Sequence, residues 1–502
     1  MEKAVRKMRN GEARMDSVTD FRIEGGIAVT LQEVLKARED RVARQNEMLR
    51  AGNPLISFTL NIPGPVKRYH LSTRAFDIGR REIENQLNRN QIKVKRFLLT
   101  DQITGKEGLW SVETDVLALK SLMVAIDEGH PIGRLFDIDV ISAEGDKIER
   151  KSVGFKERKC LICENPVHMC AGRRVHRTEE LVKAAVQMIG QHLVNTYCER
   201  VSSAAVQSLL YEVCVTPKPG LVDSENNGAH QDMDKFSFIR SASVLAPYFK
   251  QIAQQAYNCR VNGIPPQELL NNLRYAGLMA EESMYLATGG VNTHKGVIYS
   301  LGVLCAAYGY ACVCDRADLT GETAASGVEI ELDSMGLEPL IYLCSQMAFP
   351  LSGDTQGQTL TEKMMTNGER AYSEHRIRGV RGEVIAGFPS VRNYGLPALR
   401  QKLNAGWSIN DACLWALLNL MANLDDTNIL ARSNVATLMR VQEKVRSIIS
   451  DGCVLRPEDA IRVCRELDTE FIALNISPGG AADMLSVTLM IYFMEQEKIK
   501  ID

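Results

Sequence analysis

The hydrophobic pattern of the chain changes its period near residue 178, and this change limits the folds that the sequence can adopt. Before it, short alternating segments lie between helical segments; after it, nearly every segment has apolar residues at helical spacing. A chain of 502 residues is also too long for one hydrophobic core. We therefore expect a multidomain protein with a charged leader at residues 1–25, an α/β domain at residues 26–195 and an all-α domain at residues 196–502, joined by helix.

Three segments of the first domain are predicted to be strands. In residues 54–67, the apolar residues alternate with Ser57, Thr59 and Asn61 until a Pro-Gly-Pro turn, and the other two strands are expected at residues 94–105 and 134–142. Helices are expected around residues 75–87 and 114–128. Thr30 and Glu33 have the spacing of a capping box, which predicts a further helix before the first strand.

Helix starts are also marked in the second domain. Thr178 is a candidate N-cap, Ser408 and Asp411 form a capping pair, and Pro457 suits a first helical position. The uncharged residues 296–314 are long enough to cross a bilayer. They contain glycine, tyrosine and serine, and no second such segment accompanies them. A buried central helix is therefore the interpretation we prefer, with no contact to a membrane.

The net charge, the cysteines and the N-terminal sequence limit the functional classes to which the protein can belong. The net charge of −3 gives no general affinity for polyanions, so we expect no nucleic-acid partner. The 13 cysteines lie mostly in apolar segments, and the charged N-terminus lacks the apolar core of an export signal. These features predict a cytoplasmic protein whose cysteines are mostly reduced and buried.

Two aspartates of the third predicted strand are expected on one face. Asp137 and Asp139 are two residues apart in GRLFDIDV, and such residues share a face of a strand. A pair of carboxylates beside substrate phosphates suits Mg²⁺, and Arg134 is a candidate phosphate contact. The apolar neighbours favour a bound partner for the carboxylates, while a solvated strand face is the alternative.

A cysteine-rich segment follows this strand. Cys160, Cys163 and Cys170 with His168 or His176 lie within seventeen residues; with His176 the pattern is C-x2-C-x6-C-x5-H. This set of ligands is typical of a structural Zn²⁺ site. Reduced core cysteines or a redox pair are the alternatives.

The segments LISFTLNIPGPVK, GRLFDIDVI and RKCLICENPVHMCAGRRVH resemble the holo-citrate lyase synthase family over roughly residues 25–195. The resemblance implies a nucleotidyltransferase-like domain that acts as an apo-citrate lyase phosphoribosyl-dephospho-CoA transferase. A serine of the apo acyl carrier (gamma) subunit would attack the α-phosphate of a triphosphoribosyl donor, and pyrophosphate would leave. Asp137 and Asp139 would hold the metal that spreads charge on the phosphorus oxygens. Lys67 and Arg74 are weaker candidates for pyrophosphate contacts.

Five polar clusters interrupt the apolar segments of the second domain. Each has a plain alternative: a surface loop, a helix cap or a solvated charge run. Together, however, they indicate acidic metal ligands beside glycine-rich phosphate contacts. The clusters are TPKPGLVDSENNGAHQDMD (residues 216–234), GGVNTHKG (289–296), HRIRGVRGE (375–383, with Arg376, Arg378 and Arg381), LDDTNIL (424–430) and SPGGAADML (477–485), where Ser477 is a candidate cap and Pro478 a first helical residue before Gly479 and Gly480.

These clusters resemble triphosphoribosyl-dephospho-CoA synthase over about residues 200–502. The resemblance implies that the 2′-hydroxyl of dephospho-CoA attacks C1 of the ATP ribose and that adenine leaves, with Mg²⁺ holding the triphosphate. The motif positions fall on Lys218, Asp223, His230, Asp232, His294, Lys295, Arg381, Glu383, Asp425, Asp426 and Asp483. Asp425, Asp426 and Asp483 are the candidate metal ligands, and Asp232 or Glu383 is the candidate general base. After DDTN the family pattern has a glycine-containing turn, whereas this chain has ARSN.

The two implied reactions are consecutive, since the product of the second domain is the substrate of the first. The sequence therefore predicts one bifunctional transferase that builds and attaches the prosthetic group of citrate lyase. Two alternatives remain at this point. One is the equivalent enzyme system of malonate decarboxylase, but the cysteine–histidine cluster favours the citrate lyase family. The other is a zinc-stabilised binding or chaperone protein with inactive sites. The intact acidic pairs, Asp137 with Asp139 and Asp425 with Asp426, favour active sites instead.

Overall fold

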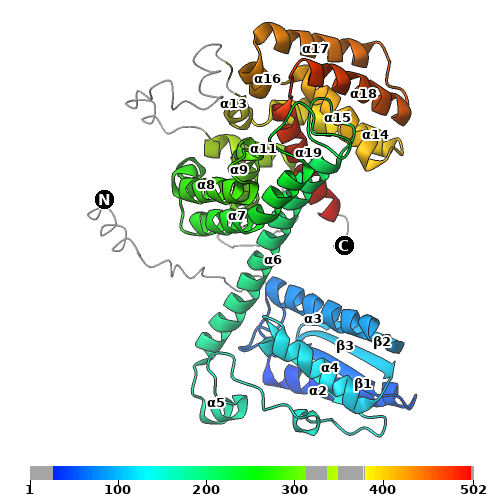
Figure 1. The fold of residues 1–502 in the computed structure, drawn as a ribbon. Coiled ribbons are helices and arrows are strands. Elements are labelled where there is room, and N and C mark those ends of the chain that lie inside the picture. The colour runs from blue at the N-terminus through cyan, green and yellow to red at the C-terminus, as the bar shows by residue number, and fades with distance from the viewer. Residues whose placement is uncertain (1–25, 313–335, 349–376, 378, 499–502) are drawn as a thin grey trace. The chain divides into compact units, whose positions relative to one another are not determined.

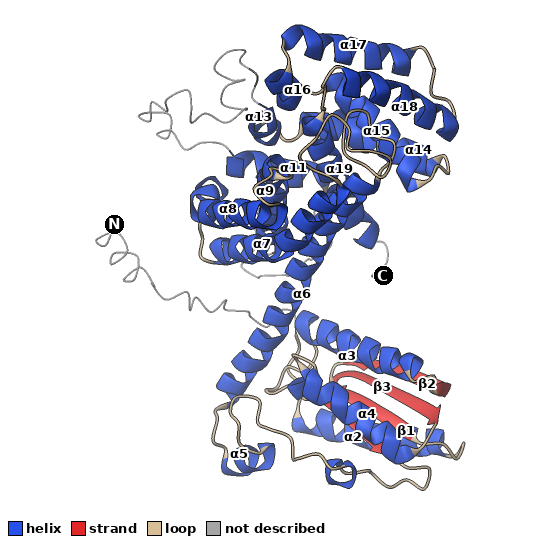
Figure 2. Cartoon of the chain, viewed as in Figure 1, coloured by secondary structure: helices blue, strands red, loops and turns tan. Residues whose placement is uncertain are grey.

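The computed structural model describes residues 26–312, 336–348, 377 and 379–498. The expected leader at residues 1–25 lies outside this part of the chain. The described residues form two compact units, which we call unit 1 (up to Asn195) and unit 2 (from Thr196). Figures 1 and 2 show strands in unit 1 and helices throughout unit 2.

Unit 1 is an α/β unit built on a four-stranded antiparallel sheet with the strand order β2-β3-β1-β4. Along the chain, its α-helices lie before, between and after the strands. Two short 3₁₀ helices, η1 and η2, come before and after β4. The elements are α2 (Leu31–Leu49), β1 (Leu55–Leu60), α3 (His70–Arg89), β2 (Lys93–Gln102), β3 (Gly105–Glu113), α4 (Val116–Gly129), η1 (Gly133–Leu135), β4 (Phe136–Ile141), η2 (Arg150–Val153) and α5 (Val167–Arg173).

The two faces of the sheet differ in character. On one face Phe58 stacks on Phe76 of α3, with ring centroids 4.8 Å apart, and meets the ring of Phe136 edge-on. On the other face Met48 of α2 packs into a small apolar cluster with residues of β1, β3 and β4. The second face becomes polar toward the end of β1, where Thr59 pairs in register with Asp137. Alternation in β1 and β4 therefore directs aromatic rings to one face and carboxylates to the other.

The predicted strands and helices of unit 1 are present. The capping box of Thr30 and Glu33 is confirmed at the start of α2. Strand β3 was not predicted. It is buried on both faces from Glu107 to Val112, and its apolar residues Leu109, Trp110 and Val112 lie on both faces, so its sequence shows no alternation. Strand β1 is also central and buried, but its buried Ser57 and Thr59 gave it an alternating sequence.

Unit 2 is helical, and it contains no strand among its described residues. Helix α6 begins in unit 1 and ends in unit 2, so the boundary between the units lies inside a helix. The elements are α6 (Thr178–Cys214), α7 (Lys235–Val261), α8 (Pro266–Thr288), α9 (Lys295–Ala311), α11 (Leu337–Ala348), α13 (Gly379–Ile385), a π-turn η4 (Val391–Gly395), α14 (Leu396–Asn404), α15 (Ile409–Asn423), α16 (Thr427–Arg432), α17 (Val435–Ser450), α18 (Pro457–Ala473) and α19 (Gly479–Lys498).

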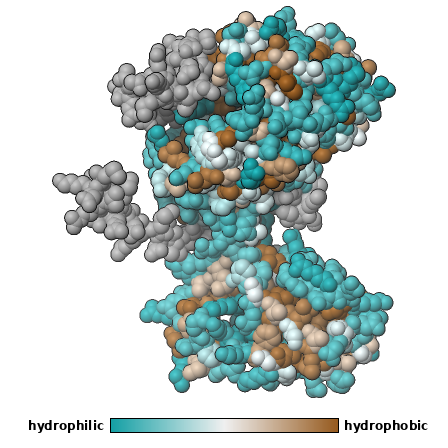
Figure 3. Space-filling view, viewed as in Figure 1, coloured by the Kyte–Doolittle hydropathy of each residue, from teal (hydrophilic) through white to brown (hydrophobic). Residues whose placement is uncertain are grey.

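Helix α9 is the centre of unit 2. Its residues are buried nearly all round, which confirms the buried-helix interpretation of this apolar segment. No described helix combines the length and apolar character that crossing a membrane requires. Figure 3 shows hydrophobic residues scattered among hydrophilic ones over the helices of this unit.

Two predicted helix starts are displaced, and two are confirmed. Ser408 accepts the Asp411 amide at the start of α15, and Pro457 opens α18. Thr178 lies inside α6 instead of capping it, because the Arg177 amide binds the Glu180 carboxylate and the Arg177 carbonyl accepts from Leu181. Helix α19 begins at Gly479, since the carbonyl of Pro478 accepts from the amide of Ala482. Ser477 is therefore not its cap.

Candidate active sites

The acidic pair of unit 1 lies on one face of the edge strand β4, as the spacing predicted. Both carboxylates are partly exposed. Asp139 Oδ2 accepts from Lys147 Nζ at 2.6 Å, and Asp137 Oδ1 is 3.6 Å from a nitrogen of Arg158. Each aspartate thus has one cation as its neighbour and retains solvent-facing oxygens.

A small basic pocket lies at the end of β1, close to Asp137. Its lining includes Thr59, which is paired with Asp137 across the strands, the cations Arg41, Lys67, Arg68 and Lys106, and the carboxylate of Glu107. Arg41, Arg68 and Lys106 already pair with Glu107, Asp101 and Asp77, respectively. Lys67 Nζ donates to the carbonyl of Ile62 at 2.5 Å. Burial lowers the pKa of Lys67, and the charge of Arg38 lowers it further. A bound anion would relieve both effects, so the pocket suits phosphate oxygens.

The four candidate zinc ligands are brought together. One ligand atom from each of Cys160, Cys163, Cys170 and His176 lies within 4.8 Å of every other, which is the spacing of a tetrahedral set. His168, the alternative ligand, pairs instead with Glu157 at 3.0 Å. The thiols and the imidazole are soft and borderline donors of the kind that Zn²⁺ prefers, so the residues present fit that ion.

Arg134 has a different neighbour from the one expected. Its guanidinium donates to the carbonyl of Cys160 at 3.1 Å and to the carboxylate of Glu164 at 2.9 Å. It therefore ties the start of β4 to the cysteine segment rather than facing the acidic pair.

In unit 2, the loop after α6 is held rigidly by its own aspartate. Asp223 accepts from the amides of Lys218 at 2.7 Å, Glu225 at 2.7 Å and Asn226 at 3.1 Å. Gly220 has a φ of +68°, and a Cβ there would lie 2.2 Å from a backbone carbonyl oxygen. Asp223 thus shapes the loop, and glycine is required at its sharpest bend.

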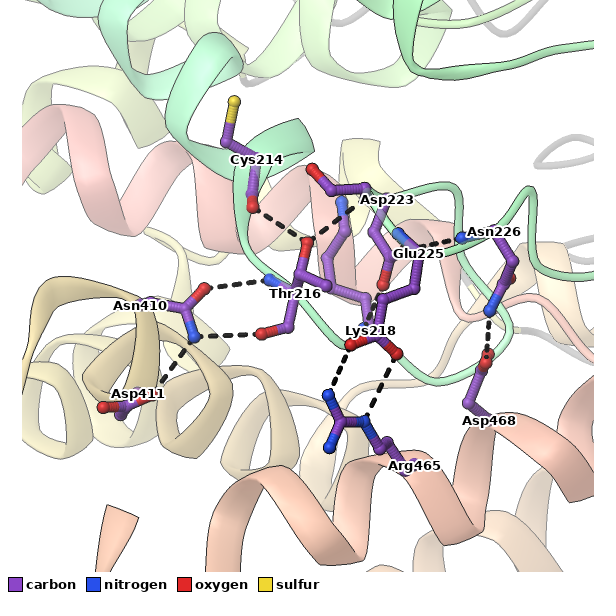
Figure 4. A network of polar contacts seen from close by, with 11 residues as sticks. Cys214, Thr216, Lys218, Asp223, Glu225, Asn226, Asn410, Asp411, Arg465 and Asp468 are labelled. Atoms are coloured by element: carbon purple, nitrogen blue, oxygen red, sulfur yellow. Dashed lines mark hydrogen bonds and ion pairs between the residues drawn. The ribbon is translucent and has the colours of Figure 1, made fainter. Parts of the chain in front are cut away.

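The same loop is anchored to two distant helices, as Figure 4 shows. Asn410 of α15 pairs with the backbone of Thr216, accepting at 2.9 Å and donating at 2.9 Å. Asp468 of α18 accepts from the Gly220 amide and from the Asn226 side chain, both at 2.8 Å. These contacts fix the position of Lys218 relative to the helical core.

Lys218 points inward and is almost fully buried. Its Nζ donates to Glu212 Oε1 at 2.5 Å and to the Glu212 carbonyl at 2.8 Å. The Lys218 and Glu212 side chains are 2% and 6% exposed, so this is a buried ion pair on the last turn of α6. Such a pair is costly to bury and points to a role beyond stability.

His294, at the N-terminus of α9, is held as a neutral imidazole. Its Nδ1 is hydrogen-bonded to Ser241 Oγ of α7 at 2.6 Å. Its Nε2 is buried and has no hydrogen-bond partner among the residues that the structure describes. Burial lowers the pKa of His294 to about 3, and the charge of Lys218 adds to this effect. The unpaired nitrogen is available to a ligand.

Asp426 joins two helices. It caps α16 through the amides of Asn428 and Ile429, at 2.8 and 3.3 Å, and its other oxygen accepts from the Ala481 amide of α19 at 3.0 Å. Burial raises its pKa to about 6, against the effect of these amides and that of Gly480. The N-terminus of α19 thus already binds a carboxylate of this chain.

Asp483, which follows the first turn of α19, faces the N-terminus of α9. A Cβ placed on Gly296 would lie 2.2 Å from Asp483 Oδ2, so only glycine leaves room for this carboxylate. Burial raises the pKa of Asp483 well above its usual range, and the charges of Asp426 and Glu212 raise it further. No described residue forms a hydrogen bond with it. Asp483 thus lies near the carboxylates of Asp426 and Glu212, and Glu212 is the acid that pairs with Lys218.

Helix α13 brings Glu383 to this region. A Cβ on Gly379 would be 2.8 Å from Thr427 of α16, and one on Gly296 would be 3.6 Å from Val380, so α13 lies beside both α16 and α9. Glu383 accepts from Ser390 Oγ at 2.7 Å. Its pKa is raised by burial, and the negative charge of Asp425 raises it further.

His230 connects the loop to α19. It is hydrogen-bonded to Ser477 Oγ at 2.9 Å and to the Arg432 guanidinium at 2.9 Å. Burial lowers its pKa to about 4, and the charge of Arg432 contributes. Asp232 lies 3.8 Å away and is largely exposed. Arg432 belongs to the ARSN segment that replaces the glycine turn of the family pattern, so the substitution supplies a cation at this point.

The five clusters thus come together around the N-termini of α9 and α19, with individual exceptions. Lys295 pairs with Glu281 at 3.0 Å on the surface. Arg381 is placed near Tyr299, whose pKa burial raises while the arginine opposes that rise. Arg376 and Arg378 lie outside the described residues. Among the described residues, the acids of unit 2 do not approach each other as closely as the cysteine–histidine set does.

Several site residues were not predicted. Glu212 lies in the apolar run LLYEVC, which carries the same signal that identified Asp425 and Asp426. Ser241, Arg158 and Arg432 have ordinary sequence surroundings, and only the fold brings them to the site.

Two family models match the chain in consecutive segments. Residues 29–192 match apo-citrate lyase phosphoribosyl-dephospho-CoA transferase, and residues 198–501 match ATP:dephospho-CoA triphosphoribosyl transferase. The second match alone covers more than half of the chain.

Curated relatives have the same arrangement. Protein CitXG of Leuconostoc mesenteroides subsp. cremoris is 32% identical over 489 residues, which is 93% of this chain and 98% of that protein. Protein CitXG of Haemophilus influenzae is 30% identical, covering 94% and 97% of the two chains. The 2-(5''-triphosphoribosyl)-3'-dephosphocoenzyme-A synthase of Klebsiella pneumoniae is 36% identical over 290 residues, or 58% of this chain and 89% of its own length. The chain therefore belongs to the fused family of apo-citrate lyase phosphoribosyl-dephospho-CoA transferase and ATP:dephospho-CoA triphosphoribosyl transferase, and it is a bifunctional transferase of citrate lyase prosthetic-group synthesis and attachment.

Proposed function

We propose that the two reactions are divided between residues 196–502 and residues 26–195. The first joins ATP to dephospho-CoA: the 2′-oxygen of dephospho-CoA bonds to C1 of the ATP ribose, the bond from C1 to adenine breaks, and adenine leaves with the proton. The second transfers phosphoribosyl-dephospho-CoA to a serine of the apo acyl carrier subunit of citrate lyase, with release of pyrophosphate.

The observation that carries the first assignment is the convergence of five polar clusters on a helical core. Helical cores seldom contain a buried, unpaired histidine nitrogen, a buried lysine–glutamate pair and two further carboxylates close to that glutamate and to each other. A ligand that supplies phosphates with a divalent cation would balance these charges.

Glu383 is the general base in this proposal. Its raised pKa lies closer to neutrality than that of an ordinary glutamate, and Ser390 fixes its orientation. The neighbouring carboxylates stabilise the positive charge that develops on the ribose as adenine departs. His230, Arg432 and Ser477 would contact phosphate oxygens, together with Arg381 and the start of α19 at Gly479 and Gly480. Lys218 and Lys295 would contribute by exchanging their present partners, Glu212 and Glu281, for phosphate.

Asp425, Asp426 and Asp483 are proposed to hold Mg²⁺ with the triphosphate. This ion usually keeps several waters and binds through one or two carboxylates plus substrate phosphates, so loosely spaced acids fit it. When bound, it neutralises phosphate charge. The buried Asp426 also fixes the ends of α16 and α19 between which the phosphates would lie.

For the second reaction we propose a nucleotidyltransferase-like site on the polar face of the unit 1 sheet. Asp137 and Asp139 would hold a metal ion that neutralises the α-phosphate, and the pocket of Lys67, Arg41 and Arg68 would bind the pyrophosphate that leaves. The alignment of Thr59 with Asp137 supports this arrangement, because it puts the pocket next to the acids.

The cysteine–histidine set is proposed to bind one structural Zn²⁺. Four protein ligands close the coordination sphere, which leaves no position for substrate.

Both reactions can be tested in one mixture of purified protein, ATP, dephospho-CoA, Mg²⁺ and the apo carrier. We expect adenine in the chromatogram and a carrier mass increased by one phosphoribosyl-dephospho-CoA group. Adenine without a modified carrier would refute the assignment of the second reaction to this chain, and the absence of both products would refute the proposal as a whole.

A further inference from the structure

The cysteine segment is connected to the acidic strand by a short hairpin. The Val167 amide donates to the Arg158 carbonyl at 2.9 Å, and the Cys160 amide donates to the Asn165 carbonyl at 2.8 Å. Lys159 and Pro166 form the bridge between these two contacts. Two of the four ligands, Cys160 and Cys163, therefore lie within the hairpin that starts at Arg158.

The side chain of Arg158 leaves this hairpin and reaches two aspartates. One guanidinium nitrogen donates to Asp127 Oδ2 at 2.9 Å, and another lies 3.6 Å from Asp137 Oδ1. Asp127 is buried and is also gripped by Arg150, at 2.8 and 2.7 Å. Asp127 is thus a fixed anchor, and the guanidinium extends from it to the carboxylate of the transfer site.

A second contact joins the same two parts. Arg134 lies two residues before the start of β4 and donates to the carbonyl of Cys160. The cysteine segment is therefore attached to β4 at its start through Arg134 and at Asp137 through Arg158. Without its four ligands held together, this short hairpin would keep its shape only through its backbone hydrogen bonds and the exposed ion pairs of Glu164 with Lys159 and Arg134.

We propose that the metal bound by Cys160, Cys163, Cys170 and His176 fixes Arg158, and that Arg158 is a positioning residue for the carrier-transfer reaction. Through its contact with Asp137 it sets the orientation of a carboxylate that faces the phosphates. This inference rests on the proposed transfer site of unit 1. It assigns a function to a cation that the sequence did not single out, and it explains why Arg134 faces the cysteines.

The test uses the full chain, whose release of adenine is an internal control for folding. Arg158→Ala and Arg158→Lys are compared with Arg96→Ala, which removes an exposed arginine of β2 that pairs with Glu47. We expect Arg158→Ala to keep adenine release and to lower kcat of carrier modification by about tenfold or more, with little change in the KM for the carrier. Arg158→Lys should recover part of the rate, and Arg96→Ala should behave as the parent.

The role of the metal is measured separately. Elemental analysis should find one zinc per parent chain and per Arg158→Ala chain, and much less in Cys163→Ser. Cys163→Ser should lose carrier transfer but keep adenine release. The double variant should lose no more than the more damaged single variant, because both changes break one linkage.

Several outcomes would overturn the proposal. A parent chain without zinc would refute the metal part, and an Arg158→Ala chain with parental transfer would refute the positioning role. Losses that add up in the double variant would mean that the two features act independently. If the parent itself modifies no carrier, the proposed transfer reaction is refuted, and the positioning role of Arg158 with it. The zinc content of the parent then shows separately whether the four ligands bind a metal.

Discussion

At the residue scale, stability and function place opposite requirements on the ionisation of Asp483. Its carboxylate lies near two other acids, has no described hydrogen bond and contacts the backbone at Gly296. Ionising it in the free protein is unfavourable, yet the proposed Mg²⁺ site requires the ionised form. Groups of this kind are characteristic of sites that exchange stability for function.

We predict that Asp483→Asn makes unit 2 more stable and inactive. The pKa of Asp483 is raised in the folded state, so the folded protein binds more protons than the unfolded one above the ordinary aspartate range. The contribution of Asp483 to stability therefore falls as the pH rises. Asp483→Asn has no carboxyl group to ionise, so its free energy of unfolding should not fall in this way. The difference in unfolding free energy between the variant and the parent should therefore grow with pH to about 1–3 kcal/mol. Thermal unfolding of both proteins across the acidic to neutral range would measure it; a variant less stable than the parent at neutral pH would contradict the prediction.

A second prediction concerns the base. Glu383→Gln should lower adenine release by roughly 10²–10⁴-fold, because the amide cannot accept the hydroxyl proton. In the parent, kcat/KM should fall on the acidic side of an inflection above the usual glutamate pKa, since burial and Asp425 raise that pKa. Asp232→Asn is the matched control at the other candidate base, and a larger loss there would transfer the role to Asp232.

How far single residues could be predicted depended on their local surroundings. Asp425 and Asp426 stood out because acids inside an apolar run need a partner, and the same reasoning applies to Glu212. The pairing of His294 with Ser241 could not be foreseen, because 53 positions separate them and serine is unremarkable within α7. Arg134 was expected at phosphates, but its neighbours are set by the hairpin that follows β4.

At the scale of elements, the sheet of unit 1 depends on the close approach of α3. A Cβ on Gly79 would lie 2.4 Å from the ring of Phe58, which is itself fully buried. We predict that Gly79→Ala costs about 1–3 kcal/mol of unit 1 stability, since the ring has no space to move. Gly129→Ala in α4 is the control, because nothing lies within 4 Å of a Cβ there.

The readout of this prediction is selective. Carrier modification should fall for Gly79→Ala at temperatures where adenine release is still normal, because α3 belongs to unit 1. Equal loss of both reactions would show that the change does not act on unit 1 alone.

Elements whose polar residues recur at a regular spacing were predictable, whether or not those residues face solvent. Strand β1 is central and buried on both faces, but Ser57 and Thr59 still alternate with its apolar residues, and helix α3 has a clear helical period. In β3 the apolar residues Leu109, Trp110 and Val112 lie on both faces, so its sequence shows no such alternation. Helix α9 was found through the reverse signal, an absence of charge that left only burial or a membrane as explanations.

At the scale of the whole molecule, helix α6 begins in unit 1 and ends in unit 2, and in the proposed assignment the product of unit 2 is the substrate of unit 1. We predict that fusion keeps part of the intermediate near the transfer site. In a chase, labelled ATP and dephospho-CoA would be turned over in the presence of unlabelled triphosphoribosyl-dephospho-CoA. More label on the carrier than the bulk dilution allows would support retention; label at the bulk ratio would refute it.

The cysteine–histidine set belongs to unit 1 alone, so in the proposed assignment only carrier transfer, and not adenine release, would depend on the supply of zinc. A cell starved of zinc would continue to spend ATP and dephospho-CoA and to release adenine, while its citrate lyase stayed immature. The nucleotide intermediate would accumulate until zinc returned, and the stored pool could then mature the lyase without fresh synthesis. The zinc supply would thereby control when the accumulated intermediate is transferred to the carrier.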